Sequence, residues 1–405
     1  MELHLLFAIR DLIYGFIPFS EWEKKIIDHP AFQRLRRIKQ LALTEMVYPG
    51  ATHTRFEHSI GVMHLASLFF DAITKDDRNK AILNDQGYEL AGLEREKQLI
   101  RFSALLHDVG HAPFSHASEE IFPLNEHGKP FKHEDYSAKI IEDIFKEPIE
   151  NNSKNRNFHI EASEVAALIT GDEIALGSRI FWKELLSSQL DVDRIDYLLR
   201  DSAHTGVKYG VIDYQRLLNT VTLGINPENE EITLGITDGG WHVAEALVLA
   251  RYSMFTQVYF HKTRRAYDYH LKQAAKSVLE DGKYPSPENL SAYLKYDDYN
   301  LYELIRNNYN EEHCKAILDR NHIRQIYATP EIPDENEIYK KNKMIEKLKA
   351  MNIWYNVDKS KKSWYKIAEE DTEIMIINED SGKANPLSKY SPIIAQMKSL
   401  KQFKI

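Results

Sequence analysis

The segment ALLHDVGHAPFSHASEE, residues 104–120, carries the pattern from which the fold and chemistry of this chain are predicted. Its apolar residues predict a helix that ends near His107 and Asp108, and Gly110 and Pro113 then break the helix and predict a turn that carries two more histidines. Neutral imidazole nitrogens and carboxylate oxygens together suit a divalent metal such as iron, manganese, nickel, zinc or magnesium. Because two adjacent ligands cannot complete a coordination shell, we expect further ligands from other segments.

Histidines are concentrated around this segment. Eight of the 17 histidines lie between residues 53 and 133, many more than an even distribution along 405 residues would place there. They are His53, His58, His64, His107, His111, His116, His127 and His133. A single histidine is usually a hydrogen-bonded polar group at the edge of a core, and we keep that interpretation for His53, His64 and His127. His58 lies at the start of a predicted helix, in RFEHSIGV (55–62).

A second helix, DVDRIDYLLRD (191–201), supplies carboxylates. Asp193, Tyr197 and Asp201 recur every four residues on a face separate from the apolar stripe. At a rise of about 1.5 Å per residue, Asp193 and Asp201 lie roughly 12 Å apart, about the span from a metal-bound phosphate to the sugar or base of a nucleotide. The alternative is a solvated acidic face with ion pairs to Arg194 and Arg200.

The pattern along the chain predicts a mostly α fold. We expect a helical domain over residues 1–330, with its metal core at about 50–205, and a small α+β unit over 331–405. A β-hairpin insertion is predicted at about 220–237 and a long helix at 241–279. In the C-terminal unit, IWYNV (353–357), SWYKI (363–367) and EIMIIN (373–378) predict short strands, followed by a short helix near 390.

Composition narrows the class of protein. The net charge of −9 argues against a broad sequence-independent nucleic-acid surface, which needs a positive field. Cys314 is the only cysteine, so no intramolecular disulfide can form, and a cytoplasmic location is the default expectation. The N-terminal residues do not resemble a signal peptide, and no stretch approaches about 18 uncharged apolar residues, so no membrane span is expected.

The histidine, the distant His-Asp pair and the more distant aspartate resemble the metal signature of the HD phosphohydrolase superfamily. The resemblance implies a helical HD-domain core and assigns His58, His107, Asp108 and Asp193 as metal ligands. It extends in order over roughly residues 8–275. The strings most similar to the dNTP triphosphohydrolase branch are FQRLRRIKQL (32–41), YPGATHTRFEHSIGV (48–62), HDVGHAPFSH (107–116), KHEDYS (132–137), DVDRIDYLLRD and HKTRRAY (261–267).

The resemblance implies hydrolysis of a deoxynucleoside triphosphate to a deoxynucleoside and inorganic triphosphate, by attack at the α-phosphate. The spacing of the residues does not itself distinguish α from γ attack. One divalent ion (Mn, Fe, Ni or Zn) is expected in the site, with Mg on the substrate phosphates. The residues expected to act in catalysis are His111, His116, His133, Glu119 and Arg55.

Within this set, His116 is our candidate for the acid that protonates the leaving 5′ oxygen, because an imidazole titrates near neutral pH. Glu119 stands where the family has an aspartate and can orient such a histidine. Arg55 can clamp a phosphate with its planar guanidinium, and Arg194 replaces a phosphate-binding lysine of the family.

The resemblance also implies a nucleoside pocket. It places Gln40 and Leu41 near the ribose, Tyr197 against the nucleotide, Asp201 near the 3′ hydroxyl and Tyr267 at the closing wall. Core packing is the alternative for Leu41 and Tyr267.

Regulation is implied by a third group of residues. Asp28, Gln33 and Arg36 match guanine-recognising positions, which implies activation by GTP or dGTP bound between the subunits of a homo-oligomer, a dimer or tetramer. The neighbouring residues Arg10, Leu12 and Tyr14 depart from the family pattern and leave the activator open.

Two other functions use the same residues. An HD phosphodiesterase or nucleotidase would employ the same metal site on another nucleotide. A nucleotide sensor or nucleic-acid-binding protein without turnover is the alternative from a different class. The presence of all four expected ligands and three accessory histidines favours an enzyme.

Overall fold

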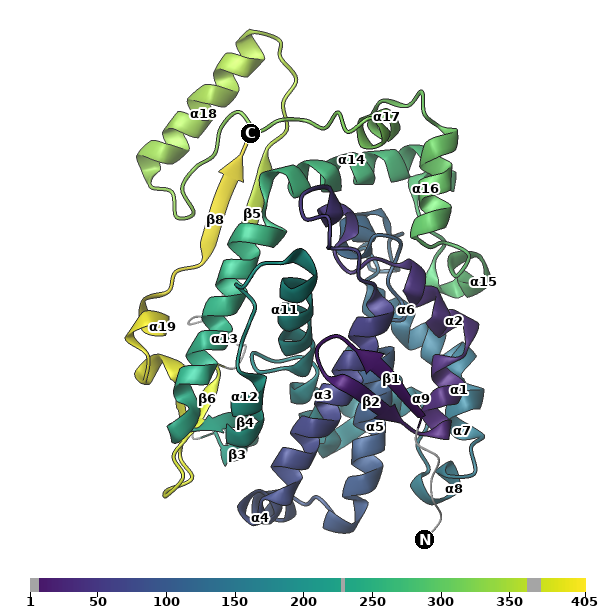
Figure 1. Ribbon diagram of the computed structural model, residues 1–405, viewed down its shortest axis with the longest axis vertical. Helices are drawn as coiled ribbons and strands as arrows, with labels where there is room; N and C mark the ends of the chain where they lie inside the picture. The colour runs from purple at the N-terminus through teal and green to yellow at the C-terminus, as the bar shows by residue number, and fades with distance from the viewer. Residues whose placement is uncertain (1–6, 227–229, 363–372) are drawn as a thin grey trace.

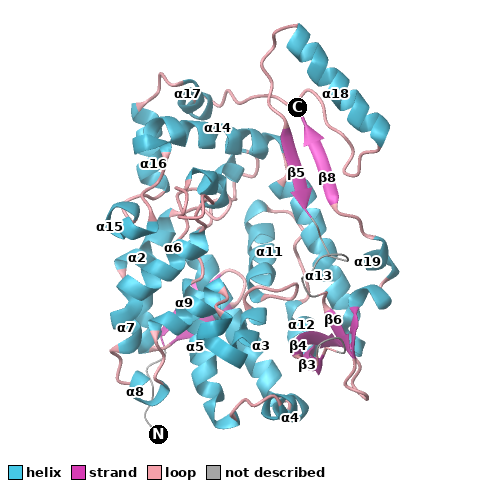
Figure 2. Ribbon diagram, turned by 180° about the vertical axis from the view of Figure 1, so that it is seen from behind, coloured by secondary structure: helices cyan, strands magenta, loops and turns pink. Residues whose placement is uncertain are grey.

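The computed structural model describes residues 7–226, 230–362 and 373–405 (Figure 1). Most of these residues are helical and the strands form small sheets (Figure 2), which confirms the predicted mostly α class. The α-helices are α1 (Glu21–Ile27), α2 (Pro30–Gln33), α3 (Arg55–Lys75), α4 (Asp77–Asp85), α5 (Leu93–Leu106), α6 (His133–Ile140), α7 (Lys146–Glu150), α8 (Asn155–Phe158), α9 (Ala162–Thr170), α10 (Glu173–Leu176), α11 (Val192–Thr205), α12 (Tyr214–Thr220), α13 (Trp241–Met254), α14 (Lys262–Val278), α15 (Leu290–Tyr293), α16 (Asp298–Asn307), α17 (Glu312–Leu318), α18 (Glu335–Ala350) and α19 (Pro392–Gln396). The strands are β1 (Phe7–Asp11), β2 (Gly15–Phe19), β3 (Val221–Ile225), β4 (Ile232–Thr237), β5 (Asp358–Lys362), β6 (Met375–Ile377), β7 (Ala384–Pro386) and β8 (Leu400–Lys404).

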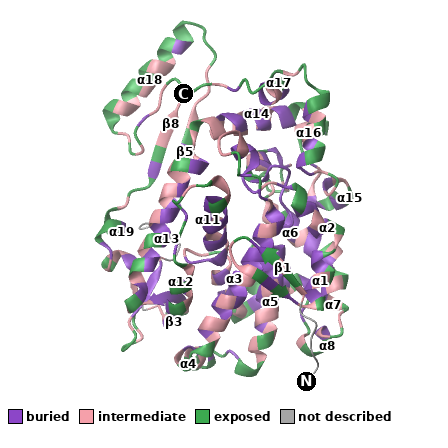
Figure 3. Cartoon of the chain, in the orientation of Figure 1, coloured by how far each residue is buried: buried purple, intermediate pink, exposed green. Residues whose placement is uncertain are grey.

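Helix α3 is the centre of the core and packs against α5 on one side and α11 on another. It starts in a capping box, in which Thr54 and Glu57 satisfy the first backbone N–H groups. Its buried residues include Leu65 and Phe69 at helical spacing, and Figure 3 shows α3, α5 and α11 as largely buried elements. This packing brings the N-terminal turns of α3 and α11 close to the C-terminal end of α5.

The turn after α5 depends on one glycine. A Cβ atom on Gly110 would lie 2.3 Å from both the His133 carbonyl oxygen and the Ser137 nitrogen of α6. Since no side chain fits there, Gly110 lets α6 approach the turn, and the Gly110 N–H donates to Ser137 Oγ at 2.9 Å. The result is that His111 and His133 lie side by side.

The first described residues form a hairpin that was not predicted from the sequence. Strands β1 and β2 pair antiparallel, with Phe7 opposite Phe19 and Asp11 opposite Gly15. The Asp11 side chain accepts hydrogen bonds from the backbone N–H groups of Ile13 and Tyr14 and so stabilises the turn.

The predicted hairpin at about 220–237 is present as β3 and β4, with Leu223 opposite Leu234. Residues from the C-terminal part extend it, because β6 pairs in parallel with β4 and β7 pairs with β6, in the order β3-β4-β6-β7. The strand predicted in EIMIIN and the helix predicted near residue 390 are observed as β6 and α19. The division of the chain at residue 330 stays a prediction.

Other predicted elements need correction. The long helix at 241–279 is two helices, α13 and α14, joined by a π-helical turn (Phe255–Tyr259) and broken before His261, whose side chain caps α14. IWYNV contains no strand; β5 begins directly after it, at Asp358. SWYKI lies outside the described residues. Helix α18 was not predicted, although its capping box of Asp334 and Glu337 is visible in the sequence.

Among the described residues, none of the helices combines the length and apolarity needed to cross a bilayer.

Candidate metal centre and active site

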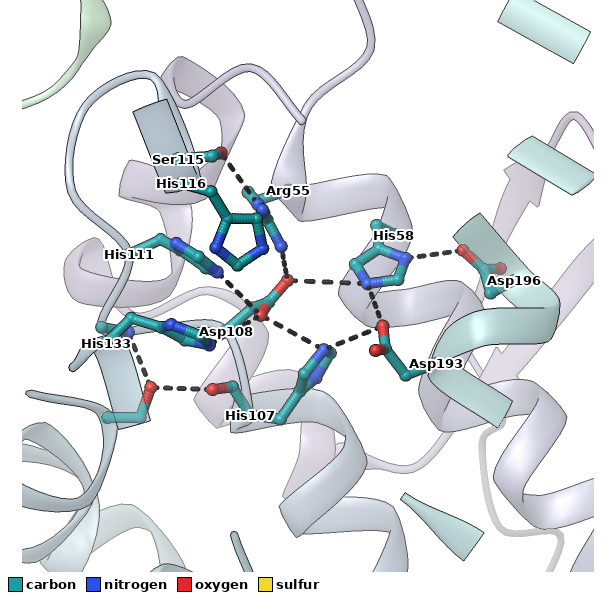
Figure 4. A network of polar contacts seen from close by, with 12 residues as sticks. Arg55, His58, His107, Asp108, His111, Ser115, His116, His133, Asp193 and Asp196 are labelled. Atoms are coloured by element: carbon teal, nitrogen blue, oxygen red, sulfur yellow. Dashed lines mark hydrogen bonds and ion pairs between the residues drawn. The ribbon is translucent and has the colours of Figure 1, made fainter. Parts of the chain in front are cut away.

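The four residues expected to bind metal lie together (Figure 4). They come from the first turn of α3, the end of α5 and the first turn of α11. His58 Nε2 lies 2.9 Å from Asp193 Oδ1 and 3.5 Å from Asp108 Oδ2. His107 Nε2 lies 3.3 Å from Asp108 Oδ1 and 3.6 Å from Asp193 Oδ1. Two imidazole nitrogens and two carboxylates thus converge from three separate segments.

The donor atoms fit a divalent cation. The Nε2 atoms of His58 and His107 are buried and form no hydrogen bond of normal geometry within the described part of the chain. Buried nitrogen atoms are seldom left in this state, so an ion that accepts their lone pairs would resolve it. His58, His107 and Asp108 each offer a ligand atom, and these atoms lie within 4.8 Å of one another. Imidazole and carboxylate together suit Mn, Fe, Ni or Zn.

The other nitrogen of each ring has a partner that orients it. His58 Nδ1 lies 2.8 Å from Asp196 Oδ2, and His107 Nδ1 lies 2.8 Å from the Ala104 carbonyl oxygen. Because both partners accept, each Nδ1 donates a hydrogen bond, and each Nε2 is the nitrogen that faces the cluster and is available to a metal.

The sequence analysis missed Asp196. It lies three residues after Asp193 on α11, and this spacing was the only signal. Arg200 donates two hydrogen bonds of 2.9 Å to Asp196 and one of 2.8 Å to Asp11 in the N-terminal hairpin. The alternative of a solvated acidic face therefore does not describe Arg200, which is buried.

Electrostatics keep the carboxylates of the cluster ionised. Burial alone would raise the pKa of Asp108, but the Arg55 guanidinium and the neighbouring histidines hold it well below its usual value. Burial would likewise raise the pKa of Asp193, whereas the neighbouring His107 and His58 imidazoles lower it. Burial would lower the pKa of His58, yet the adjacent Asp193 and Asp196 carboxylates raise it to about 10. A metal that binds His58 must therefore displace a proton.

A second cluster lies beside the first, built from the accessory histidines and Glu119. Glu119 Oε1 lies 2.8 Å from His116 Nδ1 and 2.7 Å from His133 Nδ1. The His111 ring stacks on the His133 ring, with centroids 3.8 Å apart and planes inclined by 15°. Burial would lower the pKa of His133, but its hydrogen bond with Glu119 raises it. Glu119 thus orients two imidazoles, as expected for a group that holds a proton donor.

Arg55 connects the two clusters. Its guanidinium forms an ion pair of 2.5 Å with Asp108 Oδ2, and its Nε donates to Ser115 Oγ at 2.9 Å. These contacts fix the guanidinium at the wall of a cavity of about 630 Å³.

The same cavity collects most of the predicted substrate-binding residues. Its lining includes Gln40, Leu41, Arg55, Arg194, Tyr197 and Asp201, together with His107, Asp108, His116, His133 and Asp193. Three arginines that the sequence analysis did not single out, Arg251, Arg264 and Arg265, also line it. Positive side chains and the metal cluster therefore face one space.

Asp201 is fixed from two sides within this cavity. Tyr259 donates a 2.6 Å hydrogen bond to Asp201 Oδ2, and His53 Nε2 lies 2.7 Å from Oδ1. His53 thus has the structural partner expected for it, and Tyr259 is a residue of this site that the sequence analysis missed.

Four predicted residues lie elsewhere. Tyr267 is 0% exposed, packs on the His322 ring at 4.8 Å and does not line the cavity, so its placement at the closing wall needs correction. Helix α14 turns this side chain into the core, in accord with the core-packing alternative. Asp28, Gln33 and Arg36 also lie outside the cavity lining. Arg36 is exposed and donates to Gln33 Oε1 at 2.8 Å.

Comparisons with known proteins agree with this geometry. Residues 55–201 match the HD domain, and residues 212–403 match the HD associated region. An uncharacterized protein of Methanocaldococcus jannaschii is 33% identical over 82% of this chain and 62% of its own length. A Dictyostelium discoideum protein, named a homologue of the deoxynucleoside triphosphate triphosphohydrolase SAMHD1, is 32% identical over 66% of this chain and 48% of its own length.

The fold has a solved counterpart. The crystal structure of a phosphohydrolase from Bacteroides thetaiotaomicron is 26% identical and has a TM-score of 0.71, covering 98% of both chains. The present chain spans less than two thirds of the length of either sequence relative described above.

Proposed function

Because the chain carries an HD domain followed by the HD associated region, and so belongs to the HD-domain superfamily, we propose that it is a metal-dependent phosphohydrolase of deoxynucleoside triphosphates. One observation carries the proposal: three of the four proposed metal ligands (His107, Asp108 and Asp193), five arginines and a fixed carboxylate, Asp201, line a single cavity of about 630 Å³. A cavity of this size accommodates a small organic ligand. The arginines provide the positive charge that a triphosphate requires.

We assign the two ends of the substrate to the two ends of helix α11. Asp193 belongs to the metal cluster in the first turn, and Asp201 lies about 12 Å farther along the helix. We assign the phosphates to the Asp193 end, with Arg55 and Arg194, and the deoxyribose to the Asp201 end, with Gln40 and Leu41. Tyr197 lies between these ends and packs along the nucleotide.

The metal is assigned to His58, His107, Asp108 and Asp193, and when bound it supplies Lewis-acid polarisation of a phosphate oxygen and activation of water. Magnesium on the outer phosphates would neutralise the remaining charge. Arg55 orients the phosphate, because its guanidinium is already fixed by Asp108 and Ser115.

Proton transfer is assigned to the second cluster. Water forms a new bond to the α-phosphorus and releases one proton to solvent, and the bond from that phosphorus to the 5′ oxygen breaks with its electron pair on the oxygen. His116 gives its proton to the 5′ oxygen, and Glu119, bonded to Nδ1, holds the imidazole in place so that Nε2 is the donor. His111 and His133 lie beside the same Glu119 carboxylate, and together with His116 they form the group that holds the proton.

Products distinguish this function from its alternatives. The purified chain is incubated with manganese and each dNTP, each NTP, cyclic nucleotides and deoxynucleoside monophosphates, and the products are separated by anion exchange. We expect a deoxynucleoside and inorganic triphosphate. Turnover confined to cyclic nucleotides or monophosphates would instead indicate the phosphodiesterase or nucleotidase alternative. Nucleotide binding without turnover would indicate a sensor.

Regulation is proposed from Asp28, Gln33 and Arg36. Asp28 and Arg36 are exposed and Gln33 is half-buried, and their position outside the cavity suits a second nucleotide, GTP or dGTP, bound where subunits of a dimer or tetramer meet. The same incubation with and without GTP, at matched protein concentration, tests this activation. A cytoplasmic location remains the accompanying proposal.

A further inference from the structure

The second cluster has the composition of a metal site in its own right. One ligand atom from each of His111, His116, Glu119 and His133 lies within 4.8 Å of the other three. These donors are distinct from His58, His107 and Asp193 of the first cluster. Three imidazoles and one carboxylate are a donor set that zinc binds in proteins.

His111 is the member of this donor set whose ring nitrogens lack hydrogen-bond partners among the described residues. The side chain is 0% exposed, and neither ring nitrogen forms a hydrogen bond within the described part of the chain. Its Nε2 lies 3.2 Å from Asp108 Oδ1, and its Nδ1 lies 3.8 Å from Glu119 Oε1. A buried imidazole with two unsatisfied nitrogens is costly, and an ion at Nδ1 would satisfy one of them.

The charges around the cluster favour a cation. Glu119 is joined by Glu134, whose Oε2 lies 3.3 Å from His133 Nδ1. Oε2 of Glu134 is buried and has no hydrogen-bond partner within the described chain. Two carboxylates therefore face the same group of imidazoles.

We infer that His111, His116, Glu119 and His133 form a second transition-metal site, which zinc fills and which inhibits the enzyme when filled. Zinc held tetrahedrally by these four donors has no position left for water or substrate, whereas the metal of the first cluster must keep further positions beside its four protein ligands. Zinc bound at Nδ1 of His116 replaces the hydrogen bond between His116 and Glu119. Glu119 then no longer orients His116 for proton donation to the 5′ oxygen. Zinc stands above manganese in affinity for such donors, so it can occupy this site while manganese supports turnover. The inhibition rests on the proposed function, whereas the binding does not.

The test counts bound zinc by mass spectrometry after dialysis at a fixed free zinc concentration. The wild-type chain is expected to hold two equivalents. His116→Ala and Glu119→Gln each remove the second ion, and Asp193→Ala removes the first. His116 is 61% exposed, so its replacement does not open the core. The matched control is His127→Ala, a 76% exposed histidine outside both clusters, which is expected to hold two equivalents.

Cobalt absorption gives a second readout, since the closed site gives an intense four-coordinate spectrum that is lost in His116→Ala.

The outcomes separate the two proposals. One zinc equivalent in the wild type, or two in both His116→Ala and Glu119→Gln, overturns the second site. Filling of the second site by zinc without any slowing of manganese-supported hydrolysis overturns the inhibition. Two equivalents in a chain that turns over no nucleotide support the site and contradict the proposed function alone.

Discussion

Asp196 Oδ2 accepts a hydrogen bond from His58 Nδ1 at a distance of 2.8 Å, and both side chains are fully buried. The carboxylate fixes the ring and leaves Nε2 as the nitrogen that faces Asp108 and Asp193. Asp196 is itself held by Arg200, which reaches Asp11 of the N-terminal hairpin. A chain of buried hydrogen bonds thus connects the hairpin to the metal cluster.

Asp196→Asn is expected to weaken metal binding. The amide can still accept from Nδ1 but lacks the charge that makes the imidazole a strong ligand, so the manganese Kd should rise about 10- to 100-fold. Calorimetric titration of the metal-free protein measures the change. Asp77→Asn, an exposed carboxylate on α4, serves as the control and should bind like the wild type. Equal affinity in Asp196→Asn would show that the carboxylate does not position His58.

Arg200→Gln is expected to destabilise the fold. Loss of the guanidinium leaves Asp196 and Asp11 without their buried partner, at a cost of about 3–5 kcal/mol in the free energy of unfolding. Urea unfolding followed by circular dichroism measures this cost. Arg306→Gln, at an exposed position on α16, should change stability by less than about 0.5 kcal/mol. Equal free energies of unfolding for the two variants would show that the buried hydrogen-bond network does not stabilise the fold.

Glu119→Gln is expected to change the pH dependence of kcat. The hydrogen bond with Glu119 raises the pKa of His133, so its replacement by a neutral amide lowers that pKa. His133 shares Glu119 with the donor His116, so the cluster that holds the proton loses charge at lower pH, and the alkaline limb of the profile should move to lower pH. Profiles recorded at saturating manganese test this. An unmoved alkaline limb would place the proton donor outside this cluster.

Asp201→Asn is expected to reduce discrimination at the sugar. If Asp201 binds the 3′ hydroxyl, the wild type should prefer a dNTP over its 2′,3′-dideoxy analogue by about 10- to 100-fold in kcat/KM, because a charged hydrogen bond contributes about 1.5–3 kcal/mol. The variant should lose most of that ratio while the metal content stays unchanged. Retention of the full ratio would assign Asp201 another role.

The metal cluster was expected from the resemblance to the HD phosphohydrolases, which rests on short local motifs. His107 and Asp108 are adjacent, and helical spacing relates Asp193 to Asp201. The supporting contacts were not predictable in this way. Asp11 and Arg200 are 189 positions apart, and His53 and Asp201 are 148 positions apart, so only the folded core brings them together.

The same distinction applies to the fold. Hydrophobic periodicity predicted the helices around α3 and α5, and a polar turn between apolar runs predicted β3 and β4. Periodicity continues across the break before His261, so it could not show that α13 and α14 are separate helices. Pairing of β6 with β4 joins residues more than 130 positions apart, and no local pattern specifies such a partner.

The position of the attacked phosphorus tests the proposed function most directly. Hydrolysis of a dNTP in water enriched with oxygen-18, with manganese, is followed by mass spectrometry of the separated products. Attack at the α-phosphorus places one heavy oxygen in inorganic triphosphate and none in the deoxynucleoside, and Asp193→Ala should form neither product. Heavy oxygen in inorganic phosphate beside a deoxynucleoside diphosphate would contradict the proposal, since it would show attack at the γ-phosphorus.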